Sequence, residues 1–565
     1  MMSVFATRPW LQSYAPNVPF DMSPATETLV DMMASSVQFY GERVALDFFG
    51  ATTTYRELGE QIDRAANGLG LLGVTKGDRV ALVLPNCPQH IVAFYAVLRL
   101  GAIVVEHNPL YTEGELRHQF EDHGARVAII WDKVAARVLA FPSSMGVNTV
   151  ISIDATRAMP LKQRILLRLP LAKARAVRTA LTVGWEVPGT VAWDAVLRMP
   201  PAPQPFPQIV VDDIAVIQYT SGTTGSPRGA ILTHANLRTN AMQGECWVQG
   251  LRKGEEVFYA VLPLFHAYGL TLCLSFAMSL GARLVLFPKF DEGLVLDVMR
   301  RMPATFLPAV PPIYERLAKA AARKGVSLRD IRFAISGAMS LPVEIVRTWE
   351  EATGGLLIEG YGMTETSPVA AGNPFGPTRR PGTVGVPFPS TDIRVVDPDD
   401  PSVDRGFDDE GELLIRGPQV FKGYWKRPSE TSTTLLTDGW LRTGDIVKVS
   451  SDGFITIVDR IKELIITGGF NVAPSEIEEV LLSHPDVVDA AVVGMPGKSG
   501  GEDVTAAVVL VPGAELDAEA LRALCRTSLT AYKVPKTVVQ LDDLPRSMIG
   551  KVLRREVRTL LLGRS

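Results

Sequence analysis

Hydrophobic and polar positions follow two alternating periods along the first 200 residues. Apolar residues recur at the 3.6-residue spacing of a helix in three segments, 55–72, 89–100 and 113–123. Short apolar runs with the length of buried strands lie between and after them, at 79–84, 103–105 and 126–131. Strands that alternate with helices predict an α/β fold with a doubly wound sheet.

The pattern changes twice in the second half of the chain. Short strands separated by turns dominate 391–457, which predicts a small β-barrel or sheet within about 385–459. Beyond it, strand-like and helix-like runs mix, and one of the helices begins after Asp517, a plausible N-cap. We therefore expect a large N-terminal domain of residues 1–459 and a smaller, mobile α+β domain of residues 460–565.

Length and composition exclude several classes of protein. A chain of 565 residues is too long for one hydrophobic core, and its 47% hydrophobic and 21% charged residues are ordinary for a globular protein. The formal net charge of −4 argues against a nucleic-acid binder. The four cysteines form no ligand-spaced pair, and the first residues lack the pattern of a signal peptide. We expect a cytoplasmic protein without disulfides.

Two segments raise the question of a membrane. Residues 267–282 carry no charge, but sixteen residues are short for a bilayer span of about 20, so we expect a buried helix that can wall an apolar cavity. Residues 157–178 hold seven basic residues, interleaved with leucine and alanine, and no acidic one. Such a segment is either a solvated surface insertion or a peripheral contact with the anionic inner face of a membrane.

The most informative polar stretch is 219–229. Between two apolar runs it holds three glycines, Arg228 and five aliphatic hydroxyls, those of Thr220, Ser221, Thr223, Thr224 and Ser226. Glycines let backbone N–H groups converge on one point, and the hydroxyls and arginine add donors around it. The pattern predicts a strand, a loop that cradles a polyphosphate, and a second strand. The alternative is a flexible surface loop.

Further polar positions follow apolar runs. Tyr361 lies between glycines and can offer its face to a flat base, and Glu365 is a hard oxygen ligand suited to Mg²⁺. Gly337 leaves room for a ligand beside the backbone, and Asp445 can accept the hydroxyls of a ribose. Each has an ordinary alternative, a tight turn or a solvated charge. His266 in its apolar setting is by itself more typical of a packed core residue.

Taken together and in order, these motifs resemble the adenylate-forming superfamily of acyl-CoA synthetases, luciferases and peptide-synthetase adenylation domains. The resemblance runs from about residue 29 to residue 558. Within the superfamily, the passages 108–118, 438–472 and 544–555 are most similar to bacterial long-chain fatty-acid–CoA ligases. The basic segment also lies where such ligases carry a membrane-associated region. The resemblance implies doubly wound sheets and a small β-barrel in the large domain, and a hinged C-terminal domain.

The resemblance implies a reaction in two steps. ATP and a carboxylic acid form an acyl-adenylate and pyrophosphate, and CoA then attacks to give a thioester and AMP. Mg²⁺ is the implied cofactor, with ATP and CoA as co-substrates. A carboxylate and a polyphosphate repel each other, so both charges must be neutralised. No general base is needed in the first step, because the acid is already ionised at pH 7.

The resemblance also implies roles for the matching positions. The β- and γ-phosphates are held by the loop residues Thr220, Ser221, Gly222, Thr223, Thr224, Gly225 and Arg228. Thr220 and Glu365 lie near the Mg²⁺, and Thr364 contacts the α-phosphate. Gly337 and Tyr361 lie at the adenine, and Asp445 and Arg460 bind the ribose. The family usually has lysine where this chain has Arg228.

The implied roles of the C-terminal region concern domain movement. Lys551 bridges the acid and the α-phosphate in the first step. Lys462 is the hinge about which the small domain turns, and Gly469 lies at a CoA tunnel opened by that turn. His266 helps to close the acyl site.

We expect a long-chain fatty-acid–CoA ligase. The alternatives are a ligase for medium-chain or aryl acids, an enzyme that hands its acyl-adenylate to a carrier protein, and a nucleotide-binding scaffold without catalysis. Homodimer formation is left open.

Overall fold

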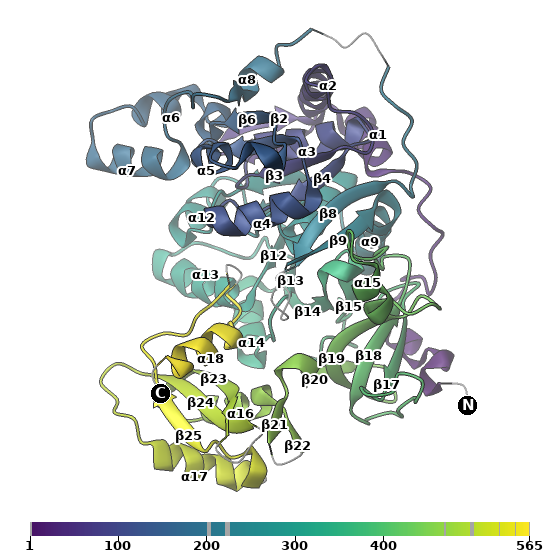
Figure 1. The fold of residues 1–565 in the computed structure, drawn as a ribbon, viewed down its shortest axis with the longest axis vertical. Helices are drawn as coiled ribbons and strands as arrows, with labels where there is room; N and C mark the ends of the chain where they lie inside the picture. Colours follow the sequence, from purple (N-terminus) through teal and green to yellow (C-terminus); the bar gives the residue numbers. More distant parts are fainter. Residues whose placement is uncertain are drawn as a thin grey trace.

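The computed structural model describes residues 3–200, 205–220, 227–467, 470–497, 502–529, 531–547 and 550–563. Within these residues the fold is α/β, with two large, mostly parallel sheets, smaller antiparallel sheets and a C-terminal α+β part (Figure 1). The fold class expected from the sequence is confirmed.

The first large sheet has the strand order β7-β6-β5-β3-β4-β8-β9. Its strands are β3 (Arg79–Val83), β4 (Ile103–Glu106), β5 (Val127–Trp131), β6 (Thr149–Ile153), β7 (Val191–Ala192), β8 (Ile214–Thr220) and β9 (Arg228–Thr233). All neighbours pair in parallel except β8 and β9. The connecting helices include α2 (Tyr55–Leu71), α3 (Pro88–Arg99) and α4 (Glu113–His123). The alternation predicted for the first 200 residues is confirmed to within a residue or two.

The second large sheet has the order β16-β15-β14-β13-β12-β10-β11-β1-β2. Its strands are β1 (Val44–Phe48), β2 (Ala51–Thr54), β10 (Val257–Ala260), β11 (Arg283–Leu286), β12 (Phe306–Ala309), β13 (Phe333–Ser336), β14 (Leu356–Gly362), β15 (Val369–Gly372) and β16 (Val386–Pro387). Helices α1 (Leu29–Tyr40), α9 (His234–Trp247), α12 (Glu292–Met299), α13 (Pro311–Lys324) and α14 (Val343–Thr353) accompany it. One continuous hydrophobic core joins the two large sheets.

The uncharged stretch 267–282 is helical and buried, as expected. It consists of α10 (Ala267–Gly269), a π-helical turn η5 (Leu270–Phe276) and α11 (Ala277–Ser279). All seven side chains of η5 are buried. Of the helices in the described part of the chain, none combines the length and the apolar character needed to cross a membrane.

The segment expected to form a β-barrel takes the form of a four-stranded antiparallel sheet. Its strands are β17 (Asp392–Val396), β18 (Gly411–Arg416), β19 (Leu441–Val449) and β20 (Ile455–Arg460), in that order, with α15 (Pro428–Thr434) beside them. Their register places Asp445 opposite Arg460. The sheet therefore brings a carboxylate and a guanidinium together at the end of β20.

The C-terminal part has hydrophobic cores of its own. It contains β21 (Ile465–Thr467), β22 (Phe470–Val472), β23 (Val487–Pro496), β24 (Glu502–Leu510) and β25 (Thr537–Gln540), with α16 (Pro474–Leu482), α17 (Ala518–Ser528) and α18 (Arg554–Leu562). The N-cap prediction for α17 is confirmed, because the Asp517 carboxylate accepts a hydrogen bond from the Ala520 N–H at 2.8 Å.

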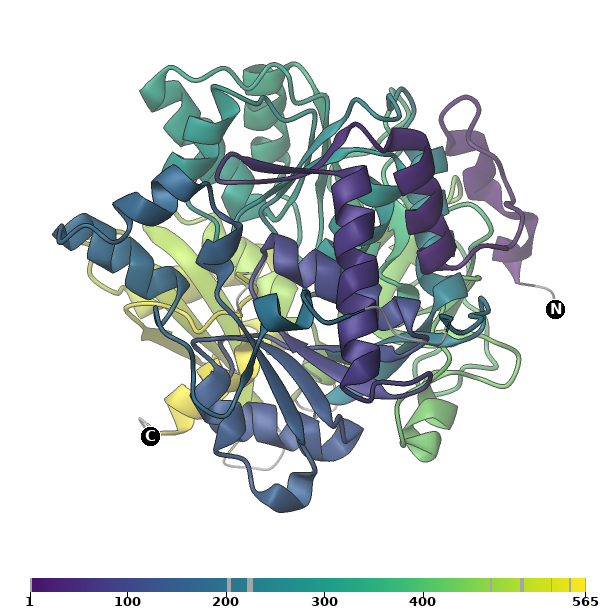
Figure 2. The same ribbon diagram turned by 90° about the horizontal axis from the view of Figure 1, so that it is seen from above.

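Two helices of the basic segment, α6 (Leu161–Leu166) and α7 (Ala172–Leu181), lie at the edge of the molecule in both views (Figures 1 and 2). None of the six side chains of α6 is buried, and in α7 only Leu181 is. The pair forms a protrusion that adds little to the core.

Candidate active site

The β8–β9 hairpin carries the strand–loop–strand pattern that the sequence predicts. Thr220 and Arg228 face each other at its end, and the Thr220 hydroxyl donates to the Arg228 carbonyl oxygen at 3.4 Å. The predicted phosphate-binding residues Ser221, Gly222, Thr223, Thr224 and Gly225 lie outside the described residues. The hairpin thus delivers one hydroxyl and one guanidinium to the same end of the sheet.

Strand β13 ends directly before Gly337, and β14 carries Tyr361. The backbone at Gly337 is closely approached, since a Cβ there would lie 3.2 Å from Cζ of Tyr268. The Tyr268 hydroxyl in turn donates to the Ile335 carbonyl oxygen at 2.6 Å. Next to it, the buried Ser336 hydroxyl finds no hydrogen-bond partner among the described residues. The strand end is therefore tightly built, and a side chain at 337 would press against the Tyr268 ring.

Of the predicted ribose and adenine residues, Tyr361, Asp445 and Arg460 form one connected cluster. The Tyr361 hydroxyl donates to Asp445 Oδ2 at 2.5 Å, and Arg460 Nε lies 3.0 Å from Asp445 Oδ1. Burial, and then the charge of Asp445, raise the pKa of the Tyr361 phenol well above its usual value. Tyr361 remains a hydrogen-bond donor, and Asp445 presents a carboxylate that is held from two sides.

Thr364 and Glu365 lie in a short 3-10 turn, η6 (Thr364–Thr366), directly after β14. The buried Glu365 accepts a hydrogen bond from the Tyr424 hydroxyl at 2.6 Å. The guanidinium carbon of Arg228 lies 4.3 Å from the centre of the Tyr424 ring. Sequence reasoning missed Tyr424, because a tyrosine between aromatic and glycine residues carries no signal of its own.

The residues present fit a Mg²⁺ ion bound together with phosphates. In the described part of the chain, no group of three or more His, Cys, Asp or Glu side chains is placed to hold a metal ion by itself. Mg²⁺ commonly uses one or two carboxylates and completes its octahedron with substrate phosphates and water. Glu365 supplies such a carboxylate, and the Thr220 hydroxyl is a second oxygen donor on the neighbouring hairpin.

Lys551 reaches the site from the C-terminal part. Burial, and then the charge of Arg460, lower the pKa of its ammonium group, while Glu463 and Asp445 act in the opposite direction. The preceding Gly550 has φ +83°, and a Cβ there would lie 3.7 Å from Sδ of Met339. Gly550 therefore lies against Met339 of the second large sheet's region, and Lys551 shares its surroundings with Asp445 and Arg460.

The remaining C-terminal candidates lie at the junction. Lys462 falls in the short turn η7 (Ile461–Glu463) between β20 and β21. Gly469 lies outside the described residues.

His266 caps the short helix α10 and is half-buried. Its Nδ1 accepts a hydrogen bond from the Tyr268 N–H at 3.3 Å, and burial lowers its pKa to about 4. It is therefore neutral at pH 7. The neighbouring Gln218, at the end of β8, donates to the Phe265 carbonyl oxygen at 2.6 Å, and its buried Oε1 has no partner among the described residues. Sequence reasoning passed over Gln218, which lies just before the polar loop.

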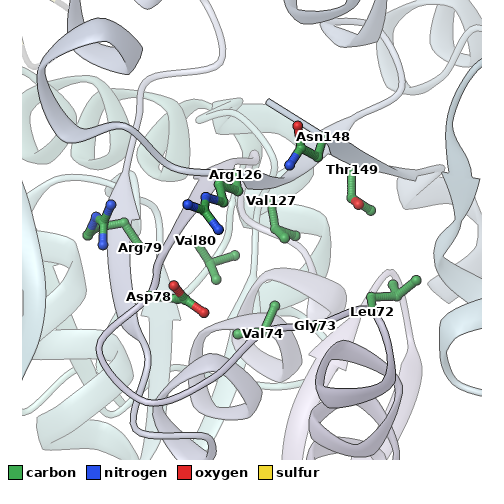
Figure 3. A pocket seen from close by; sticks show the side chains of 10 residues that line it. All are labelled: Leu72, Gly73, Val74, Asp78, Arg79, Val80, Arg126, Val127, Asn148 and Thr149. Carbon is green, nitrogen blue, oxygen red and sulfur yellow. The ribbon is translucent and has the colours of Figure 1, made fainter. Parts of the chain in front are cut away.

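A separate cavity of about 150 Å³ lies at the opposite end of the first sheet, where β3, β5 and β6 begin (Figure 3). Ligands of open α/β sheets bind at the carboxyl ends of the strands. The Arg79 guanidinium beside this cavity already donates to the carbonyl oxygens of His123 and Gly124. The cavity does not belong to the candidate site.

Comparison with known proteins agrees with the geometry. The model of the AMP-binding enzyme family matches residues 33–425, and that of the AMP-binding enzyme C-terminal domain matches residues 476–551. A long-chain-fatty-acid–CoA ligase from Bacillus subtilis (strain 168) is 36% identical over 97% of both chains. ATP-bound MatB from Rhodopseudomonas palustris is 31% identical, with a TM-score of 0.78 over 94% of this chain and 98% of that one. The anthranilate CoA ligase AuaEII with anthranoyl-AMP is 25% identical, with a TM-score of 0.81 over 96% and 99%.

Proposed function

Because the chain belongs to the AMP-binding enzyme family, in which it is an AMP-forming acid–CoA ligase, we propose that its preferred acid is a long-chain fatty acid. The observation that carries this proposal is the similarity of nearly the whole chain to ligases named for that substrate. The stretch 267–282, which follows His266, is apolar and buried in the core.

In the first step the acid's carboxylate attacks the α-phosphate and pyrophosphate leaves. Lys551 and Arg228 carry positive charge to the two ends of the triphosphate, and the Thr364 hydroxyl contacts the α-phosphate. Asp445, held by Tyr361 and Arg460, accepts the ribose hydroxyls. When bound, Mg²⁺ neutralises further negative charge on the phosphates. Loss of one such electrostatic contact typically costs about 10² to 10³ in rate.

The second step needs different surroundings, because CoA must replace the departing pyrophosphate. A division into residues 1–459 and 460–565 with a hinge at Lys462 allows Lys551 to leave and a tunnel near Gly469 to open. A hinged domain can present each arrangement in turn.

The substrate proposal is tested by a panel of acids assayed for pyrophosphate release and for consumption of the CoA thiol. We expect palmitate and oleate to react faster than acetate, hexanoate, malonate or coumarate. A faster reaction with any of the short or aryl acids would refute the long-chain assignment. Pyrophosphate release without thiol consumption would instead favour a carrier protein as the acyl acceptor.

We propose in addition that the basic segment 157–178 contacts an anionic membrane surface, from which a long-chain acid can be taken up. Leu161 is 68% exposed, and further exposed apolar side chains follow at Ile165, Leu166, Leu169 and Leu171. Arg157 pairs with Asp154 and Asp194, each at 3.8 Å. The six basic side chains from Lys162 to Arg178 form no ion pair with any residue that the structure describes. Exposed leucines among unpaired cations are typical of a segment that lies on lipid headgroups.

The membrane proposal is tested with a variant in which Arg164, Arg168, Lys173 and Arg175 are changed to Gln. Each basic residue near an anionic surface contributes about 1 kcal/mol. Binding to phosphatidylglycerol vesicles should therefore weaken strongly, while adenylation in detergent stays intact. A control variant changes four exposed basic residues on other helices, Arg64, Arg117, Lys319 and Arg347. Equal vesicle binding by both variants would refute the contact.

A further inference from the structure

Resting on the proposed function, we infer that Tyr424 is a positioning residue that aligns the metal carboxylate of Glu365 with the phosphate-side cation of Arg228. The tyrosine contacts its two partners with different groups. Its hydroxyl binds Glu365 Oε1 at 2.6 Å, and its ring face lies under the guanidinium of Arg228 at 4.3 Å. The two partners are far apart in sequence and meet at this one ring.

The hydrogen bond from Tyr424 gives the two oxygens of the Glu365 carboxylate different roles. Among the described residues, Tyr424 is the one that donates to this carboxylate, and it does so at Oε1. Oε2 is left for a cation. A carboxylate anchored through one oxygen has less rotational freedom to lose when the other oxygen binds Mg²⁺.

The ring contact accounts for the arginine at position 228. A planar guanidinium can stack on an aromatic face while its edges remain free for hydrogen bonds, which the compact ammonium of lysine cannot do. The side chain is 17% exposed, and its Nη1 lies 3.6 Å from Oε2 of Glu430. Its Nε is buried without a hydrogen-bond partner among the described residues. The guanidinium is thus held by the contact of its face with the ring, and within the described part of the chain N–H groups at its edge remain free to donate hydrogen bonds.

Backbone hydrogen bonds attach Tyr424 to both partners. The Phe421 N–H donates to the Glu365 carbonyl oxygen at 2.9 Å, which joins the segment to the turn η6. On the other side, the Trp425 N–H donates to the Gly229 carbonyl oxygen at 2.8 Å, and the Ile231 N–H to that of Gly423 at 2.9 Å. The segment 421–425 is therefore fastened between η6 and β9. A shift of either partner is transmitted to the tyrosine.

Two substitutions separate the two contacts. Tyr424→Phe removes the hydroxyl and keeps the ring beneath Arg228, whereas Tyr424→Leu removes both. The matched control is Tyr14→Phe, because Tyr14 is also buried and its hydroxyl donates to the Pro387 carbonyl oxygen at 2.7 Å, in another part of the molecule. Arg228→Lys tests the ring contact from the other side without disturbing the tyrosine.

Binding of Mn²⁺ in the presence of α,β-methylene-ATP, followed by electron paramagnetic resonance, reports on the metal site without turnover. A hydrogen bond to a charged group is worth enough that its loss should weaken Mn²⁺ binding about tenfold in Tyr424→Phe. The same variant should keep its KM for ATP at saturating metal within about twofold of wild type. Tyr424→Leu and Arg228→Lys should raise that KM several-fold, and Tyr14→Phe should change neither quantity.

The outcomes separate this inference from the function on which it rests. Unchanged Mn²⁺ binding in Tyr424→Phe, with normal binding by the wild-type protein, would overturn the positioning role alone. An equal rise of KM in Tyr424→Phe and Tyr424→Leu would overturn the division between hydroxyl and ring. Absence of Mn²⁺ binding in the wild-type protein would overturn the metal site itself.

Discussion

Replacing Asp459 by alanine should detach the C-terminal domain from the arrangement seen in the structure. Asp459 lies near the end of β20, and its side chain is 2% exposed. Its Oδ2 accepts hydrogen bonds from the Ser475 N–H at 2.9 Å and the Ser475 hydroxyl at 2.7 Å, and Arg554 Nη1 lies 3.7 Å from Oδ1. Both partners lie beyond the turn η7, in the C-terminal part. This carboxylate therefore joins β20 to α16 and α18.

The magnitude follows from these contacts. Each hydrogen bond to a charged group contributes about 1.5–3 kcal/mol, so loss of the two from Ser475 costs at least about 3 kcal/mol. Arg554 keeps its ion pairs with Glu463 and Glu478, so no cation is left unpaired and no further penalty is added. A change of about 3 kcal/mol raises the detached population about a hundredfold.

Limited trypsin digestion measures that population, because Arg460 and Lys462 are cleavage sites at the junction itself. In Asp459→Ala, cleavage there should accelerate by up to about a hundredfold, and acyl-adenylate formation should slow more than thioester formation. The control is Asp400→Ala, which removes an exposed carboxylate that serves its own turn through Ser402. Equal cleavage rates in the wild-type protein and Asp459→Ala would refute the reasoning, as would equal acceleration by the control.

Three further outcomes test the site and the stability. Lys551→Ala should slow pyrophosphate release about 10²- to 10³-fold and spare thioester formation from added acyl-adenylate; equal loss in both assays would contradict this. Asp445→Asn should raise the KM for ATP with little effect on that for CoA. Burial lowers the pKa of His107 and His234 to about 4. The unfolded chain therefore takes up protons first as pH falls below about 6.5, and up to about 3 kcal/mol of stability per histidine should be lost by pH 4. Replacing both histidines by glutamine should flatten that decline in urea unfolding.

Elements with local signals could be predicted closely from the sequence. Helix α4 begins where Thr112 and Glu115 form a capping box, and its expected bounds, 113–123, are those observed. Asp517 caps α17 through a single hydrogen bond from the Ala520 N–H. Such signals act within a few residues, so the local sequence is enough to determine where these helices begin.

Other features depend on partners that are distant in the chain. The π-helical turn η5 was expected only as a buried helix, because its form depends on packing rather than on its own composition. Strand β1 pairs with β11, so the N-terminal strands complete the second sheet rather than the first. No local pattern indicates which sheet these strands join. The pairing depends on which hydrophobic surfaces they can pack against in the folded chain.

By itself, the sequence determined the chemical inventory of this protein: a polar loop between strands, a tyrosine and a glutamate after a strand, and a lysine near the C-terminus. It also supported the family, because several motifs stood in order. Only the tertiary structure decided that Asp445 is held by Tyr361 and Arg460, and that Tyr424 joins Glu365 to Arg228. The physical reason is that a buried polar group needs a partner, and the partner is supplied by whichever strand end packing brings within reach.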